Sequence, residues 1–388
     1  MQIDFHYYAA YCAAFLAGYS HEESLAIAYA DEFTDLCSAT LLKKLKAPVS
    51  AATTQLQSEL MNSGDGVIGL QNITRIWASF HFLPRDLYAA YPRRPKRWLN
   101  KYRLLCGPDG ALAAETVELA KGRGLAAAGL AMHIISDTWA HTYFAGTPSA
   151  AMNNTNDYFC ETVNENGKEV ERKPRFIHNP AAKDDLERCV YVNSIRQENE
   201  NSVMNLGHGR AGHLPDYSFA RYKYLPSWGD YAVIEKDNPS DYYKAFCQMV
   251  IALEYLRGAR DSFETGTYDC AAVLPYEKEI RGITGIRQLC ASDQWKALGE
   301  KLSGESIEDF DIDKYQQEYL DAAASGKNGT FLGSYFLAAM AQKSMVTHRI
   351  FESGNPLAGF SVDFSLKGFR GIKDFRELIR HPGGDRHE

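Results

Sequence analysis

The chain has 388 residues, of which 45% are hydrophobic and 23% are charged, and its formal net charge is −7. This balance is typical of a folded globular protein and excludes a disordered or fibrous chain. The negative charge gives no overall attraction to nucleic acid or to an anionic membrane, so such a partner would need a local basic patch. We expect one domain over residues 1–388.

A local basic patch lies between Arg93 and Arg103, where the segment RRPKRWLNKYR carries six basic residues together with Trp98 and Tyr102. A solvated basic face is the ordinary interpretation of such a run, and contact with phosphate or a lipid headgroup is the alternative. The sequence has no specific nucleic-acid motif and no run of the ~18 to 20 apolar residues that a transmembrane helix needs.

The cysteines and the N-terminal segment bear on the cellular compartment. The eight cysteines are scattered without a CxxC pair, which favours reduced thiols over a disulfide framework. The opening segment MQIDFHYYAAYCAAFLAG lacks a basic stretch before its apolar residues, so we interpret it as a folded helix and not as a signal peptide. We expect a cytoplasmic protein, and export by a signal-independent route stays open.

The first part of the chain predicts helices and one extended segment. Residues 1–45 indicate a helical pair, and the second helix opens at Ser20 with Glu23 three positions later, as in a capping box. Residues 66–84 combine β-branched and aromatic side chains and end at a proline, which predicts a short strand or an extended segment.

The middle of the chain predicts a long helical region followed by an insertion. Residues 111–145 are rich in helix formers and contain two glycines near their centre, which predicts two helices or one kinked helix. Residues 150–200 are polar and resemble an insertion with a hairpin around Asn166-Gly167. Residues 205–230 mix glycines, prolines and aromatics without a period, which predicts an ordered loop.

The remainder alternates helix signals with glycine stops, and the tail over 368–388 is charged and predicted to be frayed. Helices are expected near residues 240–264, 276–290, 293–302, 312–324 and 330–351. The fold class that follows is mostly α, a multi-helix fold with a polar inserted hairpin and loop region.

The clearest chemical pattern is AMHIISDTWAH, in which His133, Asp137 and His141 are spaced i, i+4, i+8. At ~3.6 residues per turn these positions drift by only about 40° per step and share one helix face. The neighbouring residues are apolar, and a buried carboxylate with two imidazoles is costly unless it is paired or binds a metal. Imidazole nitrogen and carboxylate oxygen are suitable zinc ligands. A hydrogen-bonded cluster that only holds helices together is the alternative.

Other candidate ligands are scattered along the chain. His6 stands beside two tyrosines and His81 between two phenylalanines, so a packed core histidine is the alternative for both. Asp31 and Asp35 share a helix face, which is also ordinary for a pair of acids on an exposed helix.

The segment GHGRAGHLPD contains His208 and His213 beside glycines that let the backbone approach a centre closely. Its formal G-x-G-x-x-G pattern is not interpreted as a dinucleotide site, because no clear buried strand precedes it and no helix follows it. Whether Asp216 joins the site stays open.

The order of these residues resembles the ligand series of the zinc-dependent phospholipases C and the related fungal single-strand nucleases. The matching residues are His6, Asp35, His81, His133, Asp137, His141 and His208. The resemblance lies in residue order and in the HxxxD helix and spans roughly residues 6 to 213. The segments MQIDFHY, FHFLP, HxxxDTWAH and GHxxxGHxPD also resemble an uncharacterised bacterial family.

The resemblance implies an all-helical hydrolase that binds one to three zinc ions, with other divalent metals possible. It implies that His81, His133 and Asp137 hold one ion, and that His6 and Asp137 contact a second. The implied substrates are small-molecule or lipid phosphoesters.

The resemblance further implies a third ion at His141 and His208, and Asp35 as the catalytic carboxylate that orients or deprotonates the attacking water. Two differences stand out. The phospholipases use a processed N-terminal amine as a ligand, whereas this chain shows no signal to remove. They also place Glu four residues after the last histidine, where this chain has Gly212 followed by His213.

The predicted function is therefore metal-dependent hydrolysis of a phosphoester by a metal-activated water. Two alternatives keep the metal. A His/Asp site on helices is also compatible with an amidohydrolase or, with iron, an oxygenase. A non-catalytic binding protein stabilised by a closed metal site is the third possibility.

Overall fold

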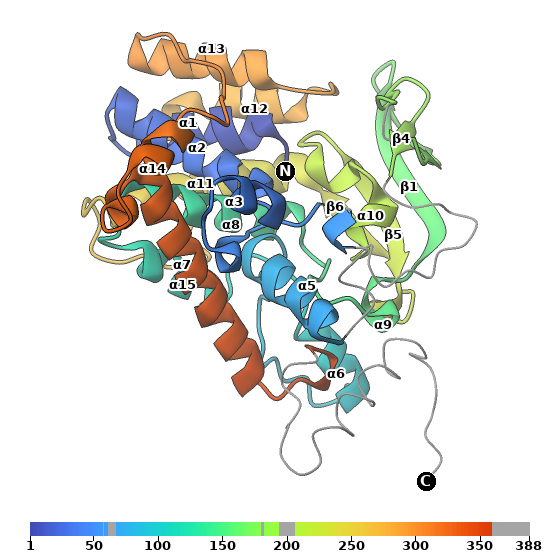
Figure 1. The fold of residues 1–388 in the computed structure, drawn as a ribbon. Helices are drawn as coiled ribbons and strands as arrows, with labels where there is room; N and C mark the ends of the chain where they lie inside the picture. The colour runs from blue at the N-terminus through green and yellow to red at the C-terminus, as the bar shows by residue number, and fades with distance from the viewer. Residues whose placement is uncertain (57, 61–66, 180–181, 194–205, 359–388) are drawn as a thin grey trace, which may run out of the picture.

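Helices form most of the structure, and a small sheet lies along one side of them (Figure 1). The computed structural model describes residues 1–56, 58–60, 67–179, 182–193 and 206–358. The predicted mostly α class is therefore confirmed. The predicted tail over 368–388 lies outside the described residues.

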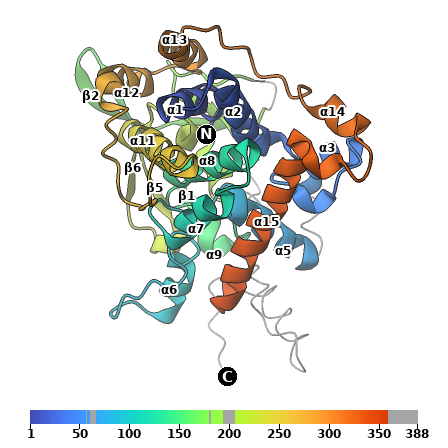
Figure 2. The same cartoon turned by 90° about the vertical axis from the view of Figure 1, so that its left-hand side faces the viewer.

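The longer elements give the order of the chain, and the two views in Figures 1 and 2 show their arrangement. The helices of the first half are η1 (Asp4–Ala9), α1 (Ala10–Leu16), α2 (His21–Leu36), α3 (Ala39–Lys44), α5 (Val67–Phe80), α6 (Lys96–Tyr102), α7 (Ala111–Ala120), α8 (Leu125–Ala140) and α9 (Ala150–Asn153). Those of the second half are α10 (His208–Ala211), η5 (Leu214–Asp216), α11 (Asn238–Leu256), α12 (Glu277–Gly285), α13 (Ser292–Ser303), α14 (Gln316–Asp321) and α15 (Phe331–Glu352).

Helix α8 is the centre of the helical core. Every residue from Ala126 to Ala140 is buried, as expected for a helix that is apolar on all sides. It packs against α2, α7, α11 and α15. The prediction of two helices within 111–145 is confirmed, because α7 ends at Ala120 and Gly124 precedes α8 with a φ of 83°.

A close approach between α2 and α8 depends on Gly129. A Cβ atom at this position would lie 2.2 Å from the carbonyl oxygen of Ile27 and 3.0 Å from the backbone nitrogen of Asp31. Only glycine fits, because another side chain would force the two backbones apart. Since Asp31 is one turn beyond Ile27 and His133 is one turn beyond Gly129, this contact brings the acidic face of α2 against the histidines of α8.

The start of α2 is fixed by the predicted capping box. The backbone nitrogen of Glu23 donates to Ser20 Oγ at 3.2 Å, and the backbone nitrogen of Ser20 donates to Glu23 Oε2 at 2.9 Å. These two bonds satisfy donors that the first helical turn leaves without partners. The predicted helical pair over the first residues is confirmed, and its first member begins as the π-helix η1 before it continues as α1.

The prediction of a strand or extended segment over 66–84 is wrong, because residues 67–80 form helix α5. The large side chains that suggested a strand recur at helical spacing, and Ile73, Ile76 and Phe80 are all buried. Burial of this face against the body outweighs the β preference of the individual residues, which is mainly a preference for a packed, half-buried surface. The helix ends just before His81.

The sheet contains most of the predicted insertion and part of the predicted loop. Its four strands run antiparallel in the order β2-β1-β5-β6, and β3 and β4 form a separate parallel pair. The strands are β1 (Thr155–Glu165), β2 (Lys168–Arg172), β3 (Arg175–Ile177), β4 (Val190–Val192), β5 (Arg221–Pro226) and β6 (Ile234–Asp237). The predicted hairpin is confirmed, since Asn166 and Gly167 both have positive φ between β1 and β2, as a type I′ turn requires.

The prediction of a loop without elements over 205–230 is wrong in part. Residues 221–226 form β5 between β1 and β6, and buried and half-buried side chains alternate along it. Tyr222 and Tyr224 point into a second apolar cluster with Phe144 and Phe159. An aromatic residue at every second position is a strand signal, but the nearby glycines and prolines obscured it.

Helices are found at each of the five positions predicted for the last part of the chain, although α11, α12 and α14 end earlier than expected and α14 also begins later. No helix among the described residues is long and apolar enough to cross a membrane.

Candidate metal centre

Histidines and aspartates from distant parts of the chain meet beside α8. Within the described part of the chain, three groups of side chains have ligand atoms close enough together to hold a metal ion. The first group is His6, Asp31 and His133; the second is Asp35, His81 and His133; the third is His141, His208 and Asp216. Helices η1, α2 and α8, the end of α5, α10 and η5 supply them.

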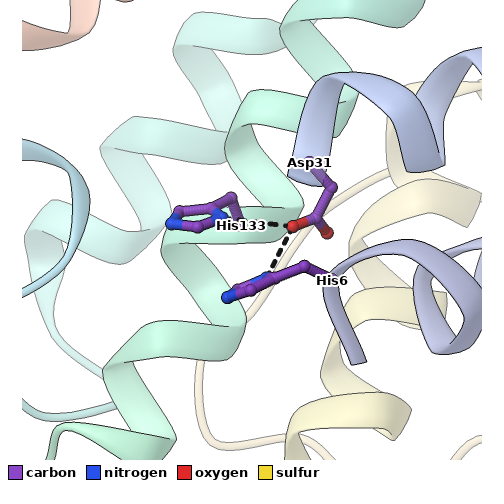
Figure 3. Close-up of side chains that lie close together, drawn as sticks. All are labelled: His6, Asp31 and His133. Carbon is purple, nitrogen blue, oxygen red and sulfur yellow. Dashed lines mark hydrogen bonds and ion pairs between the residues drawn. The ribbon is translucent and has the colours of Figure 1, made fainter. Parts of the chain in front are cut away.

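The first group lies between η1, α2 and α8 (Figure 3). Asp31 Oδ1 is 2.7 Å from His6 Nδ1 and 3.3 Å from His133 Nδ1, and all three side chains are fully buried. The two imidazole rings stack with their centroids 4.0 Å apart. One carboxylate therefore orients two imidazoles, so that the other nitrogen of each ring is turned away from Asp31.

The second group is fixed by a backbone contact of His81. Its Nε2 donates to the carbonyl oxygen of Thr53 at 3.0 Å, which leaves Nδ1 without a proton in the neutral ring. This Nδ1 lies 3.2 Å from His133 Nε2, 3.1 Å from Asp137 Oδ2 and 3.6 Å from Asp35 Oδ1. In the neutral ring, the lone pair of His81 Nδ1 therefore faces the carboxylate oxygens of Asp137 and Asp35.

Asp137 is shared by the histidines on both sides of it. Its Oδ2 is 3.1 Å from His81 Nδ1 and 3.3 Å from His133 Nε2, while its Oδ1 is 3.4 Å from His6 Nε2. The side chain is 1% exposed. Its two oxygens therefore face different imidazoles, which is the arrangement of a carboxylate that can bridge two ions.

The third group follows the C-terminal end of α8. His141 Nδ1 donates to the carbonyl oxygen of His81 at 2.8 Å, so its Nε2 is free to face Asp216 Oδ1 at 3.3 Å. His208 Nε2 lies 3.2 Å from the same oxygen. Burial lowers the pKa of His141 to about 4, so this ring is neutral near pH 7, as a metal ligand must be.

The α-amine of Met1 also reaches the cluster. It is buried and lies 3.0 Å from Asp137 Oδ1 and 3.4 Å from Asp216 Oδ1. Burial alone lowers the pKa of this amine, but the negative charges of Asp137, Asp216 and Asp35 outweigh it and raise the pKa to about 11. The amine therefore shows how strongly this pocket attracts positive charge.

The hydrogen bonds of the imidazoles test whether the residues fit a metal. A histidine that binds a metal usually donates its second ring nitrogen to a carboxylate or a backbone carbonyl. His6 does so to Asp31, His81 to Thr53 and His141 to the carbonyl of His81. His6 Nε2 is buried without a hydrogen-bond partner among the described residues and faces Asp137. Nitrogen lone pairs directed at carboxylate oxygens repel unless a proton or a metal ion lies between them, so the donor set fits a metal cluster.

The charges within the cluster support the same conclusion. Burial alone raises the pKa of Asp137 and of Asp216, but the surrounding imidazoles and the Met1 amine hold both pKa values well below their usual range. Both carboxylates are therefore ionised near neutral pH. Burial also lowers the pKa of His6 and of His133, but the carboxylates of Asp31, Asp35 and Asp137 outweigh it and raise both pKa values, so this side of the cluster attracts positive charge, as a cation site does.

The cluster is open to solvent at one edge. The Asp35 side chain is 33% exposed and that of His208 is 21% exposed, whereas His6 and His133 are fully buried. Solvent can therefore reach the carboxylate of Asp35 and the imidazole of His208.

His213 lies apart from the three groups. Its Nδ1 is 2.8 Å from Asp184 Oδ2, and its side chain is 46% exposed. Asp184 also accepts hydrogen bonds from the Tyr217 hydroxyl and the Val192 amide. The other predicted ligands come together, but His213 is held by a carboxylate of the insertion instead.

The sequence left open whether Asp31 and Asp216 join the site, and it did not predict that the Met1 amine would reach it. Asp31 lies one turn before Asp35 on α2, and that spacing was its signal. Asp216 follows closely after His213 within the histidine-rich segment. For Met1, no signal exists in the residues themselves, because its burial depends on how η1 packs against α2 and α13.

The comparison with protein families gives one match. The family described as "Family of unknown function (DUF6765)" matches residues 1–350, which include every residue of the cluster. No curated protein and no solved structure matches this chain significantly. The chain therefore belongs to this family of unknown function.

Proposed function

We propose that this chain is a metal-dependent hydrolase of phosphoesters with a zinc cluster beside α8, related to the zinc-dependent phospholipases C and single-strand nucleases. One observation carries the proposal. Side chains from both halves of the chain converge in the order of that ligand series, and their free imidazole nitrogens face the carboxylates. A coincidental core of packed histidines has no reason to adopt this arrangement.

The contacts suggest how the residues divide the ligands. His81, His133 and Asp137 would hold one ion, with His6 and the second oxygen of Asp137 at a neighbouring one. The remaining group of His141, His208 and Asp216 would hold another.

Asp31 has a different role in this proposal. Because its Oδ1 is within hydrogen-bond distance of His6 Nδ1 and lies close to His133 Nδ1, it orients both rings and makes their other nitrogens better donors. We therefore assign Asp31 as a positioning carboxylate and not as a ligand.

When bound, zinc lowers the pKa of water to about 7 and neutralises negative charge that develops on a phosphoryl group. Asp35 is the exposed carboxylate of the cluster, and its oxygens lie 3.6 to 3.8 Å from the imidazole nitrogens of His6, His81 and His133. In this position it can orient the attacking water and accept its proton.

The exposure of the cluster bears on the non-catalytic alternative. A closed structural metal site has four protein ligands and excludes water. The partial exposure of Asp35 and His208 favours a site that admits a substrate. An amidohydrolase and an iron oxygenase share these ligands, and the choice of phosphoesters comes from the resemblance.

The test uses the purified full chain after removal of metal with a chelator. Hydrolysis of bis(p-nitrophenyl) phosphate, of a short-chain phosphatidylcholine and of single-stranded DNA is measured before and after addition of Zn²⁺, Mn²⁺ or Fe²⁺. We expect activity on at least one phosphodiester to be lost on stripping and restored by Zn²⁺. No hydrolysis of any of the three with any metal would contradict the proposal.

A matched pair of variants separates the reaction from metal binding. Asp35→Asn should lose at least about 100-fold in kcat, in line with general-base catalysis, while the bound metal is retained. Asp184→Asn, which changes a carboxylate outside the three groups, should keep the activity. Equal losses in both variants would count against a special role of Asp35.

A further inference from the structure

A second chemically distinctive surface lies far from the metal centre. Helix α6 and the loop before it project at the lower end of the molecule, opposite α12 and α13 (Figure 2). We refer to residues 85–103 as the basic projection. Its exposed face carries Tyr88, which is 60% exposed, Tyr91, which is 45% exposed, and Arg93, Arg94 and Lys96.

The base of the projection is held firmly. Trp98 is buried and stacks on Tyr102 with ring centroids 4.7 Å apart, and Trp98 also approaches Trp228 of the sheet region. The Lys101 ammonium is buried and donates to the carbonyl oxygen of Ser227 and to Asp230, both at 3.1 Å. These contacts fix α6 to the body, so the exposed residues are presented on a supported surface.

Three exposed cations of the basic projection remain without an ion-pair partner in the described part of the chain. Among the described residues, Arg93, Arg94 and Lys96 form no ion pair, and the Arg94 guanidinium instead lies 4.7 Å from the centre of the Trp98 ring. The whole chain is acidic, with a formal net charge of −7. A cluster of positive charge on a negative protein directs one face towards an anionic partner.

We propose that the basic projection binds the anionic surface of a lipid membrane. Exposed tyrosines are suited to the boundary between lipid and water, because the ring is apolar and the hydroxyl polar. Each basic residue near an anionic leaflet adds about fivefold to binding. The inference rests on this surface alone and does not depend on the metal centre.

The geometry favours a membrane over a nucleic acid. Binding of single strands normally uses a positively charged groove and aromatic rings that are free to stack on bases. Here the surface projects outwards, and Trp98 and Tyr102 are already stacked on each other within the protein. Tyr88 and Tyr91 remain partly exposed, and Tyr91 packs edge-on against the Trp98 ring that the Arg94 guanidinium also contacts.

The experiment is co-sedimentation of the full chain with vesicles of pure phosphatidylcholine and of phosphatidylcholine with 30% phosphatidylserine (about a third anionic, enough to set a negative surface potential). We expect binding only to the anionic vesicles, and weaker binding at high salt. The variant Arg93→Ser/Arg94→Ser/Lys96→Ser should weaken the binding by on the order of 100-fold. Tyr88→Ser should weaken it several-fold.

Matched controls remove the same number of cations, or a side chain of similar exposed fraction, elsewhere on the protein. Lys168→Ser/Lys173→Ser/Arg175→Ser removes three exposed cations near β2 and β3 and should keep the binding. Leu274→Ser, at a side chain 61% exposed, is the control for Tyr88→Ser and should have no effect.

Three results would overturn the proposal: no binding to either vesicle, equal binding to both vesicles, or equal losses in the basic-projection variant and its control. Single-stranded DNA is tested in parallel as a competitor. Tighter binding to DNA than to the anionic vesicles, lost in the same triple variant, would assign the surface to nucleic acid and also overturn the membrane proposal.

Discussion

The two sides of the metal centre differ in how the chain holds them. His6, Asp31 and His133 come from the packed helices η1, α2 and α8 and are fully buried. In the group at the end of α8, the His208 and Asp216 side chains are 21% and 11% exposed and come from segments of only a few residues.

The two sides differ in how easily their side chains can move. Side chains on long helices cannot move without disturbing the core, so the buried side is suited to a permanent metal site. The outer side follows a loop in which Gly207 and Gly212 have positive φ, and short loop segments open at lower cost than packed helices. We expect metal on the buried side to be bound more tightly than metal on the outer side.

The largest effect should come from Asp137→Asn, because Asp137 contacts His6, His81 and His133 at once. Loss of an outer-shell partner costs about 10- to 100-fold in metal affinity, and loss of a shared ligand should exceed 100-fold. Competition with a chromophoric zinc chelator measures the affinity, and circular dichroism verifies folding. A folded variant with unchanged affinity would show that Asp137 is not a ligand.

A smaller loss is expected for Asp31→Asn. An amide can still accept a hydrogen bond but lacks the charge that makes His6 and His133 better donors, so the affinity should fall about 10- to 100-fold. The same chelator competition measures it. Asp184→Asn is the control, since Asp184 holds His213 outside the cluster, and it should leave the affinity unchanged.

The variant His208→Ala should affect only the outer side. We expect it to lose the weakest-binding metal ion, while the buried side keeps its metal, as measured by elemental analysis after gel filtration. His213→Ala should retain the full metal content. Loss of all metal in His208→Ala would show that the two sides are not independent, and loss of metal in His213→Ala would restore His213 as a ligand.

The smallest effect should be the pH dependence of the His213–Asp184 pair. The hydrogen bond to Asp184 raises the pKa of His213 above its usual value of 6.5. The pair therefore stabilises the fold fully below about pH 6.5 and loses this contribution as the pH rises through the higher pKa of the folded state. Because His213 is 46% exposed, the contribution should be well below ~1 kcal/mol.

Urea unfolding of wild type and His213→Gln at pH 5.5 and pH 8.5 measures this contribution. The difference in unfolding free energy between the two proteins should be larger at pH 5.5 than at pH 8.5. A difference that grows with pH would contradict the assignment of the pair.

The sequence could predict that His133, Asp137 and His141 lie together, because helical spacing alone places them on one face of α8. It could not predict how α2 meets that face, since the contact depends on the missing side chain of Gly129 against the backbone of Ile27. It also gave the wrong element for residues 66–84. There, the same apolar side chains fit a strand locally, and only packing against the helical body selects the helix.

The sequence predicted that these side chains meet in one place better than it predicted what each of them contacts there. The sequence left open whether Asp31 joins the site, and its Oδ1 contacts with two imidazole Nδ1 atoms are the basis on which we propose it as a positioning carboxylate. The partner of His213 could not be foreseen, because Asp184 comes from the insertion, whose position depends on the pairing of β1 with β5.

The most direct test of the metal cluster is a crystal structure of the zinc-loaded full chain with anomalous diffraction measured on both sides of the zinc absorption edge. We predict an anomalous peak in contact with His81, His133 and Asp137. Asp31 should lie outside contact distance of this peak, and one coordination position should be open towards Asp35. No peak among these residues, or an ion enclosed by four protein ligands without an open position, would contradict this prediction.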